Sequence, residues 1–264
     1  MPELPEVETV VRSIQRLVGR RIASAEFRNL RVLRGGDPDA MAVRLQGRKI
    51  AAVKRYGKFI VASLRGGGYL MIHLGMTGRL LLGGPVGKHT HAVFTFDRGL
   101  LLYDDSRQFG CIEFSEEFPP RVARLGPEPL EISFEDFAAG VKRRKTSIKA
   151  LLLNQTFVRG IGNIYADEAL FRAGIHPQSQ AARIRRDRAR KLYDAVAAVL
   201  TEAIAAGGSS ISDYVDGEGR KGFFQFSHRV YQRTGEPCTA CKTPIRRVIV
   251  TQRSSHFCPK CQKR

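Results

Sequence analysis

The first six residues, Met1-Pro2-Glu3-Leu4-Pro5-Glu6, combine a candidate nucleophile with two acids. Once the initiator methionine is removed, Pro2 bears a secondary amine beside the carboxyl groups of Glu3 and Glu6. Such an amine can attack an electrophilic carbon while a neighbouring carboxyl group moves a proton. The other interpretation is an ordinary Met-Pro start, with acids that favour the N-terminus of a helix. These residues alone do not decide between the two, because short motifs also arise by chance.

Four of the five cysteines form two pairs near the C-terminus, Cys238 with Cys241 and Cys258 with Cys261. Two Cys-x-x-Cys pairs at this separation are typical of a tetrahedral zinc site. Because cysteine would fill all four positions, none stays open for water, and the zinc would stabilise the fold without doing chemistry. The fifth, Cys111, lies in an apolar run typical of a strand, and we expect it to be a buried small hydrophobic residue.

The chain of 264 residues carries 44 Lys and Arg against 25 Asp and Glu, a formal net charge of +19. This excess indicates a polyanionic partner, most often a nucleic acid, although a basic chain can also simply be soluble. The C-terminal half has the larger net charge and is expected to make most of the phosphate contacts. No apolar run approaches the roughly 20 residues that cross a bilayer, and no secretion signal is visible, so we expect a cytoplasmic protein.

The hydrophobic pattern predicts a change from β to α structure along the chain. Residues 5–18 have an apolar stripe at helical spacing, and this helix would hold the N-terminus in place. Residues 20–115 contain short β-branched segments, such as Lys58–Leu64 and His91–Phe96, which predict a sandwich or a barrel. Helices follow the break at Gly126–Pro129, and the C-terminal residues predict a β-hairpin around the zinc.

Over essentially its whole length, the sequence resembles the formamidopyrimidine-DNA glycosylase family, relatives of endonuclease VIII. The motifs that carry the resemblance are Met1–Val10, Lys58, His73–Met76, Asp105–Gly110, Gly160–Ala166, Gly222–Gln225, Val230–Cys238 and Gln252-Arg253. The resemblance implies an α+β fold of two domains. An N-terminal β-sandwich with an N-terminal helix (1–130) precedes a helix–two-turn–helix domain (131–226), which ends in a zinc-ribbon β-hairpin (227–264) holding one structural Zn²⁺.

The family's chemistry assigns a role to each candidate catalytic residue. By resemblance, the Pro2 nitrogen attacks C1′ of a flipped nucleotide, Glu3 donates the proton that opens the sugar ring, and Glu6 supports Glu3. Lys58 matches the lysine of the β-elimination step, and Arg253 matches the arginine of the second, δ-elimination. Without the resemblance, Lys58 would be interpreted as a solvated strand lysine and Arg253 as a single phosphate contact.

Three further residues match the family's side chains that fill the gap left by a flipped base. These are Met76, Arg107 and Phe109, with Arg107 facing the orphaned base. Taken alone, Met76 and Phe109 would be interpreted as core residues, but they occur in polar, glycine-containing stretches that predict loop tips. Gln108 stands where relatives often have arginine, which would weaken one phosphate contact.

The remaining DNA contacts are also implied by the resemblance. Gly160–Asn163 would be the turn of the helix–two-turn–helix unit, whose backbone amides and Asn163 cradle a phosphate. The other phosphate candidates are basic side chains, namely Lys88, His89, His91 and Arg144. The basic run Arg183–Lys191 is interpreted as a solvated helix face. The segment Ser209–Phe226 matches the lesion-recognition loop.

These expectations combine into a bifunctional DNA glycosylase and AP lyase of base excision repair. It would remove oxidised purines, 8-oxoguanine and formamidopyrimidines, through a Schiff base on Pro2 followed by β,δ-elimination. Its partner would be double-stranded DNA containing oxidised bases or abasic sites, and the protein would act as a monomer. Three alternatives stay open: an endonuclease VIII-like glycosylase for oxidised pyrimidines, a non-catalytic lesion-binding protein, and a zinc-ribbon RNA-binding protein.

Overall fold

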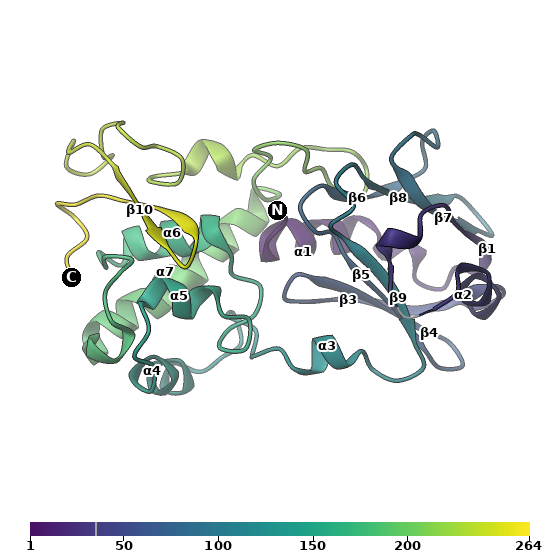
Figure 1. Cartoon of the computed structure of the whole chain (residues 1–264), viewed down its shortest axis with the longest axis horizontal. Coiled ribbons are helices and arrows are strands. Elements are labelled where there is room, and N and C mark those ends of the chain that lie inside the picture. The colour runs from purple at the N-terminus through teal and green to yellow at the C-terminus, as the bar shows by residue number, and fades with distance from the viewer. Residues whose placement is uncertain (35) are drawn as a thin grey trace. The chain divides into compact units, whose positions relative to one another are not determined.

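The computed structural model describes residues 1–34 and 36–264, and its contacts divide the chain into two compact units (Figure 1). The first unit comprises Met1–Arg124 with Ala206–Gln225, and the second comprises Leu125–Ala205 with Phe226–Arg264. Residues 206–225 therefore group with the first unit and not, as the expected boundary at residue 226 implied, with the helices. The zinc element groups with the helices in one unit.

The N-terminal helix α1 spans Leu4–Ser13 and is followed by a 3-10 turn at Gln15–Leu17. Pro5 lies in its first turn, where the absence of a proline N–H costs nothing. The α-helical part ends earlier than the expected residue 18. The Ser13 hydroxyl donates to the Val10 carbonyl at 2.7 Å, a local bond that competes with the helical ladder.

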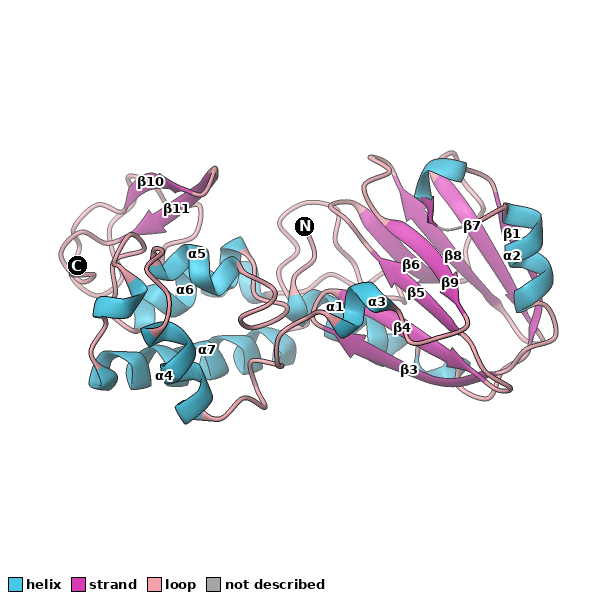
Figure 2. Cartoon of the chain, turned by 60° about the horizontal axis from the view of Figure 1, so that its bottom comes forward, coloured by secondary structure: helices cyan, strands magenta, loops and turns pink. Residues whose placement is uncertain are grey.

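Two sheets form the body of the first unit, and Figure 2 shows their strands in magenta. Their strands are β1 (Ile22–Phe27), β2 (Leu33–Arg34), β3 (Ile50–Tyr56), β4 (Phe59–Leu64), β5 (Tyr69–His73), β6 (Gly78–Leu82), β7 (Thr90–Phe96), β8 (Leu100–Asp105) and β9 (Cys111–Ser115). The four-stranded sheet has the order β1-β7-β8-β6, and the five-stranded sheet has the order β2-β9-β5-β4-β3. The pairing is antiparallel except between β2 and β9.

One apolar core joins both sheets and α1, which confirms the predicted β-sandwich with an N-terminal helix. Val7 and Val10 from α1 pack in the same cluster as Ile60 and Ile72 of one sheet and Phe94 of the other. Alternate residues of strands such as β4 and β7 contribute to this core, as expected where one face of an antiparallel sheet is buried. Since α1 shares this core, packing fixes the position of the chain's first residues.

The β-rich region contains a helix that was not predicted from the sequence. Helix α2 spans Pro38–Leu45, and Asp37 caps it by accepting from the Ala40 N–H at 2.9 Å. An Asp-Pro start of this kind is a recognised helix signal, and Met41 with Leu45 provides the buried side. The short helix α3 (Pro120–Ala123) follows β9.

The second unit is helical, as predicted, and carries a two-stranded hairpin. Its elements are α4 (Phe134–Lys142), α5 (Ile148–Leu153), α6 (Asn163–Arg172), α7 (Arg186–Ala205), β10 (Arg246–Val250) and β11 (Arg253–Phe257). Ser133 caps α4 by accepting from the Asp136 N–H at 3.1 Å, which confirms the helix start expected from this pair. Helix α7 ends just before Gly207-Gly208, as expected. Among the described helices, none is long and apolar enough to cross a membrane.

The β10–β11 hairpin closes through an unusual turn. Val250 pairs with Arg253, and the two residues between them, Thr251 and Gln252, have φ values of 46° and 60°. Two positive φ values in a two-residue loop define a type I′ turn, which normally uses Asn-Gly. A β-branched residue such as Thr251 is disfavoured in this region, so the tip is under local strain.

The shared core makes a first testable prediction. Ile22 is 0% exposed within it, and Ile22→Ala should lower the free energy of unfolding of the first unit by about 2–5 kcal/mol. The matched control is Val43→Ala on the exposed side of α2, where the change should stay within about 0.5 kcal/mol. Chemical denaturation followed by hydrogen exchange in the sandwich measures both. Equal effects of the two substitutions would contradict the placement of the core.

Candidate functional site

The start of α1 brings together Pro2, Glu3 and Glu6. All three are buried, and Glu3 and Glu6 are each only 2% exposed. The two acids form a capping box, in which each side chain accepts from the other residue's backbone N–H. Glu6 Oε2 accepts from the Glu3 N–H at 2.8 Å. The acids thus have the structural role that the sequence offered as its second interpretation, and the same bonds fix Glu3 beside Pro2.

Glu6 also connects α1 to the segment Ala206–Gln225. Its other oxygen, Oε1, accepts from the backbone N–H of Ser209 at 2.7 Å, across 203 residues of sequence. The Tyr214 hydroxyl lies 3.2 Å from the Glu6 carbonyl oxygen and 3.1 Å from that of Gly207. Burial, with the Glu6 carboxylate, raises the pKa of Tyr214, so the hydroxyl keeps the proton that it donates.

Gly208 lies where this connection leaves no room for a side chain. Its φ of +83° is in the left-handed region, and a Cβ there would lie 2.7 Å from Glu6 Oε1. A Cβ on Gly222 would in turn overlap the Gly208 carbonyl oxygen. Gly208 therefore allows the backbone to approach the carboxylate closely, and Gly222 allows a second stretch of backbone to pack against Gly207 and Gly208.

Lys58 lies in the turn between β3 and β4 and is 8% exposed. Burial, together with the positive charges of Lys58 and Arg121, lowers the pKa of His73 to about 4. His73 is therefore neutral near pH 7, and its Nδ1 accepts from the Gly75 N–H at 3.1 Å. This bond orients the turn that carries Met76.

Met76, Arg107 and Phe109 project from two neighbouring loops of the first unit. Met76 is 38% exposed and Phe109 is 58% exposed, so neither is a core residue. The Arg107 guanidinium lies 4.7 Å from the centre of the Phe109 ring, a cation–π distance. Both apolar side chains are thus accessible at the surface of the first unit, as the sequence analysis expected of loop tips.

A single buried carboxylate, that of Asp105, holds both loops together. Its Oδ1 accepts from the Thr77 hydroxyl at 2.6 Å and from the Arg107 N–H at 3.3 Å. Its Oδ2 accepts from the Gly110 N–H at 2.8 Å and the Tyr103 hydroxyl at 3.2 Å. Asp105 was expected only as part of the motif Asp105–Gly110, without a role of its own. An acid that ends an apolar strand directly before a polar loop was the signal for this role.

The two histidines among the phosphate candidates lie in different environments. His89 is exposed, whereas His91 is buried and its Nε2 lies 2.8 Å from the Asp105 carbonyl oxygen. A carbonyl oxygen only accepts, so Nε2 carries the proton, and Nδ1 could donate to a phosphate only from a doubly protonated ring. The His91 ring therefore uses Nε2 to support the end of β8.

The second unit carries the other candidates. Asn163 is the first residue of α6, and its Oδ1 is buried without a hydrogen-bond partner among the described residues. Arg144 is exposed after α4, and Arg253 is exposed at the start of β11. Three charged residues of this unit are buried and were not predicted from the sequence, namely Lys149, Asp167 and Glu168. Two consecutive acids within an otherwise apolar helix were the signal that could have indicated them.

Four thiols of the second unit form a site that fits one zinc ion. The Sγ atoms of Cys238, Cys241, Cys258 and Cys261 all lie within 4.8 Å of one another. Two of the separations are 3.9 and 3.4 Å, close to the roughly 3.8 Å edge of a tetrahedron with Zn–S bonds of about 2.3 Å. Cys111 is buried outside this cluster, as expected. The cysteine cluster therefore holds a structural zinc, because protein ligands fill every position.

Known proteins match this chain over its whole length. A curated formamidopyrimidine-DNA glycosylase from Solibacter usitatus is 83% identical over 264 residues, covering 100% of both chains. The chain belongs to the formamidopyrimidine-DNA glycosylase family. Residues 1–112 match the formamidopyrimidine-DNA glycosylase N-terminal domain, residues 125–215 the formamidopyrimidine-DNA glycosylase H2TH domain, and residues 235–264 the zinc finger found in FPG and IleRS.

Solved structures of formamidopyrimidine-DNA glycosylases have the same fold. The MutM (FPG) protein from Thermus thermophilus superposes with a TM-score of 0.90 at 41% identity, covering 99% of this chain and 98% of that one. A mutant FPG from Lactococcus lactis, in complex with a Fapy-dG containing DNA, gives 0.92 at 35% identity and full coverage of both chains. These matches confirm the family and the α+β fold with its helix–two-turn–helix and zinc-hairpin parts.

The crowding around Glu6 predicts the effect of a single methyl group. Gly208→Ala should destabilise the first unit by more than the about 1–2 kcal/mol expected from left-handed backbone strain alone, because the methyl group displaces the Glu6 carboxylate. The matched control is Gly83→Ala, which has φ +78° and nothing within 4 Å of its Cβ. Denaturation and exchange of the Ser209 amide measure the difference. Equal losses in the two variants would show that the Glu6 contact contributes nothing.

Removal of zinc should disorder the hairpin selectively. Cys241→Ser with a chelator should raise amide exchange in β10 and β11 by about 10-fold or more, because metal binding supplies the folding free energy of such small elements. Helix α7 should keep its protection. Cys111→Ser is the matched control and should retain one zinc per chain. Unchanged exchange in the hairpin after verified loss of metal would contradict the prediction.

Proposed function

We propose that the protein is a DNA glycosylase that excises oxidised purines from double-stranded DNA and then cleaves the abasic product as a lyase. The observation that carries the proposal is the arrangement at α1. A chain whose second residue is proline places two buried carboxyl groups beside that proline and fixes them with backbone hydrogen bonds. Helix capping alone does not require the additional bond from Glu6 to Ser209.

In the proposed reaction, Pro2 is the nucleophile. After removal of Met1, its nitrogen becomes an α-amine, which titrates near pH 8, so an appreciable fraction is unprotonated at neutral pH. The amine attacks C1′, the C1′–base bond breaks, and the bond electrons leave with the base. Glu3 supplies the proton needed to open the sugar ring, and the resulting iminium is the Schiff base that links the protein to DNA. Glu6 is the positioning residue that holds Glu3.

Two positively charged side chains would then complete the cleavage of the DNA strand. Lys58 would assist β-elimination, in which a proton leaves C2′ and the 3′ phosphate departs with the bond electrons. Arg253 would assist δ-elimination, in which a proton leaves C4′ and the 5′ phosphate departs. A guanidinium suits this step, because its fork of N–H donors binds phosphate oxygens in pairs.

The DNA would be held by contacts of two kinds. Met76, Arg107 and Phe109 would enter the duplex and fill the space left by the flipped nucleotide, since exposed apolar wedges offset part of the unstacking cost. Phosphates would be bound by basic or amide groups, namely Lys88, His89, Arg144 and Asn163. The buried, hydrogen-bonded His91 is assigned to loop support, in place of the phosphate contact expected from the sequence.

The proposed substrate class is oxidised purine, with Ala206–Gln225 as the segment that contacts the lesion. Its connection to Glu6 supports this assignment, since it makes the segment and the start of α1 parts of one unit. The Lactococcus lactis relative, whose structure contains Fapy-dG DNA, matches this chain over its full length. We further propose that the protein acts as a monomer.

Borohydride trapping tests the nucleophile. Protein beginning at Pro2 should form a stable covalent adduct with a duplex containing 8-oxoguanine, because borohydride reduces the iminium. The control is the same chain with Met1 retained behind a non-cleavable extension, which makes the Pro2 nitrogen an amide. Gel shift and intact mass measure the adduct. If the extended chain gave an equal yield of adduct, the nucleophile would be a residue other than Pro2. If neither protein formed an adduct, the result would favour the alternative of a non-catalytic lesion-binding protein.

Substitution of the acid tests the second role. Glu3→Gln keeps an oxygen that can accept the capping bond but cannot donate a carboxyl proton. Base excision should fall by about 10²–10⁴-fold, the usual contribution of general acid–base catalysis. Affinity for lesion DNA should stay within about threefold, because the fold and charge elsewhere are unchanged. Single-turnover kinetics and binding assays measure the two effects. A parallel loss of affinity and excision would indicate a structural role only.

A further inference from the structure

The second unit contains a buried ion pair that the proposed chemistry does not use. Lys149 of α5 and Asp167 of α6 both have fully buried side chains, and Lys149 Nζ lies 2.6 Å from Asp167 Oδ1. Burying two charges costs free energy that their attraction often fails to recover, so a pair of this kind rarely adds net stability over apolar residues of similar volume. The contacts that the pair makes beyond itself indicate what it does.

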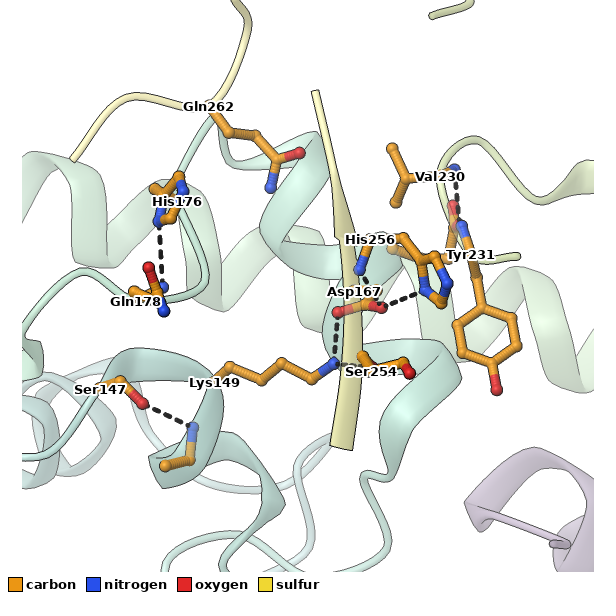
Figure 3. A network of polar contacts seen from close by, with 12 residues as sticks. Ser147, Lys149, Asp167, His176, Gln178, Val230, Tyr231, Ser254, His256 and Gln262 are labelled. Atoms are coloured by element: carbon orange, nitrogen blue, oxygen red, sulfur yellow. Dashed lines mark hydrogen bonds and ion pairs between the residues drawn. The ribbon is translucent and has the colours of Figure 1, made fainter. Parts of the chain in front are cut away.

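Both charges also contact β11 (Figure 3). Lys149 Nζ donates to the Ser254 carbonyl at 3.0 Å. Asp167 Oδ2 accepts from the His256 backbone N–H at 2.8 Å and lies 3.1 Å from the His256 ring Nδ1. The ion pair therefore holds strand β11 at two alternate residues, Ser254 and His256. These contacts prevent the strand from sliding along its own axis and also fix its distance from α6.

The hairpin needs such an external anchor because its own turn specifies the register poorly. In a hairpin the register is set by the turn, and the preferred type I′ sequence is Asn-Gly. Here Thr251 and Gln252 occupy the two left-handed positions. The exposed Arg253 follows this turn. The residue after it is Ser254, whose carbonyl accepts the hydrogen bond from Lys149.

We propose that Lys149 and Asp167 are positioning residues for Arg253. By holding the Ser254 carbonyl and the His256 N–H, they keep β11 in the register that directs the guanidinium toward the phosphate released by δ-elimination. The inference rests on the proposed function. In this proposal, the buried pair controls the ratio between the product of β-elimination alone and the product of complete β,δ-elimination. The chemistry itself is unchanged, because the pair neither donates nor accepts a proton in either step.

The test is the ratio of δ- to β-elimination products on a duplex with a single abasic site. Lys149→Met keeps an unbranched side chain but removes both Nζ contacts. The ratio should fall by about 10-fold or more, because small displacements of a catalytic group have large effects on rate. The rate of Schiff-base formation, measured by trapping, should stay within about threefold, since Pro2 and Glu3 belong to the other unit. If the parent protein formed no β-product, the proposed function would fail and not this inference.

The matched control is Arg172→Met, which makes a similar change on α6, the helix that carries Asp167. Arg172 donates two hydrogen bonds of 2.6 Å to Glu202 of α7, so its pairing joins α6 to α7 and not to the hairpin. This variant should lose stability but keep the parental product ratio. A similar fall in the ratio in both variants would overturn the proposal in favour of general destabilisation. A parental ratio in folded, zinc-loaded Lys149→Met would also overturn it.

A second pair of substitutions separates positioning from folding. Thr251→Asn with Gln252→Gly gives the turn its preferred type I′ residues, so the register no longer depends on the anchor. Added to Lys149→Met, this change should restore the ratio to within about threefold of the same turn variant with Lys149 intact. If Lys149→Met folds poorly, Lys149→Met with Asp167→Leu leaves no unpaired lysine or aspartate and should show the same rescue. Failure of the turn change to rescue a folded variant would refute a register-setting role.

Discussion

The interaction on which the rest of the first unit depends is the two-sided hydrogen bonding of the Glu6 carboxylate. One oxygen holds the helix start at Glu3, and the other holds Ser209. A carboxylate suits this position because a charged oxygen forms stronger hydrogen bonds with backbone N–H groups than a neutral acceptor does. Gly208 is required because any side chain there would occupy the space of the carboxylate. The candidate acid, the candidate nucleophile and the candidate lesion segment thus depend on one side chain.

The same physical solution recurs in each part of the molecule. Asp105 holds the two loops that carry the exposed apolar side chains, and Asp167 holds β11. Loops and edge strands have backbone N–H groups without regular partners, and leaving such groups buried and unpaired is costly. A single buried acid can satisfy two or three of them and fix their direction. This is how irregular segments, which lack a hydrophobic core of their own, become precise enough to carry a binding surface.

Much of this arrangement could be predicted from the sequence, and what could not has a physical reason. The four cysteines, the apolar stripe of α1 and most strands of the sandwich are local patterns. Helix α2 was missed because its signal is only the pair Asp37-Pro38 and a narrow buried face. The environment of His91 and the roles of Asp105 and Asp167 depend on residues distant in sequence or on strand pairing. No spacing rule reveals such contacts, although acids inside apolar segments mark where to look.

The first unit is formed by two segments that are distant in sequence, Met1–Arg124 and Ala206–Gln225, and this has a consequence during protein synthesis. Glu6 leaves the ribosome early, but Ser209 is translated 203 residues later. The sandwich can therefore collapse as a nascent domain, whereas the segment that completes it arrives only after most of the helical unit has been made. Until that moment the hydrogen bond from the Ser209 N–H to the carboxylate cannot form. Translation order alone thus delays the complete arrangement around Glu6 until most of the chain has been made.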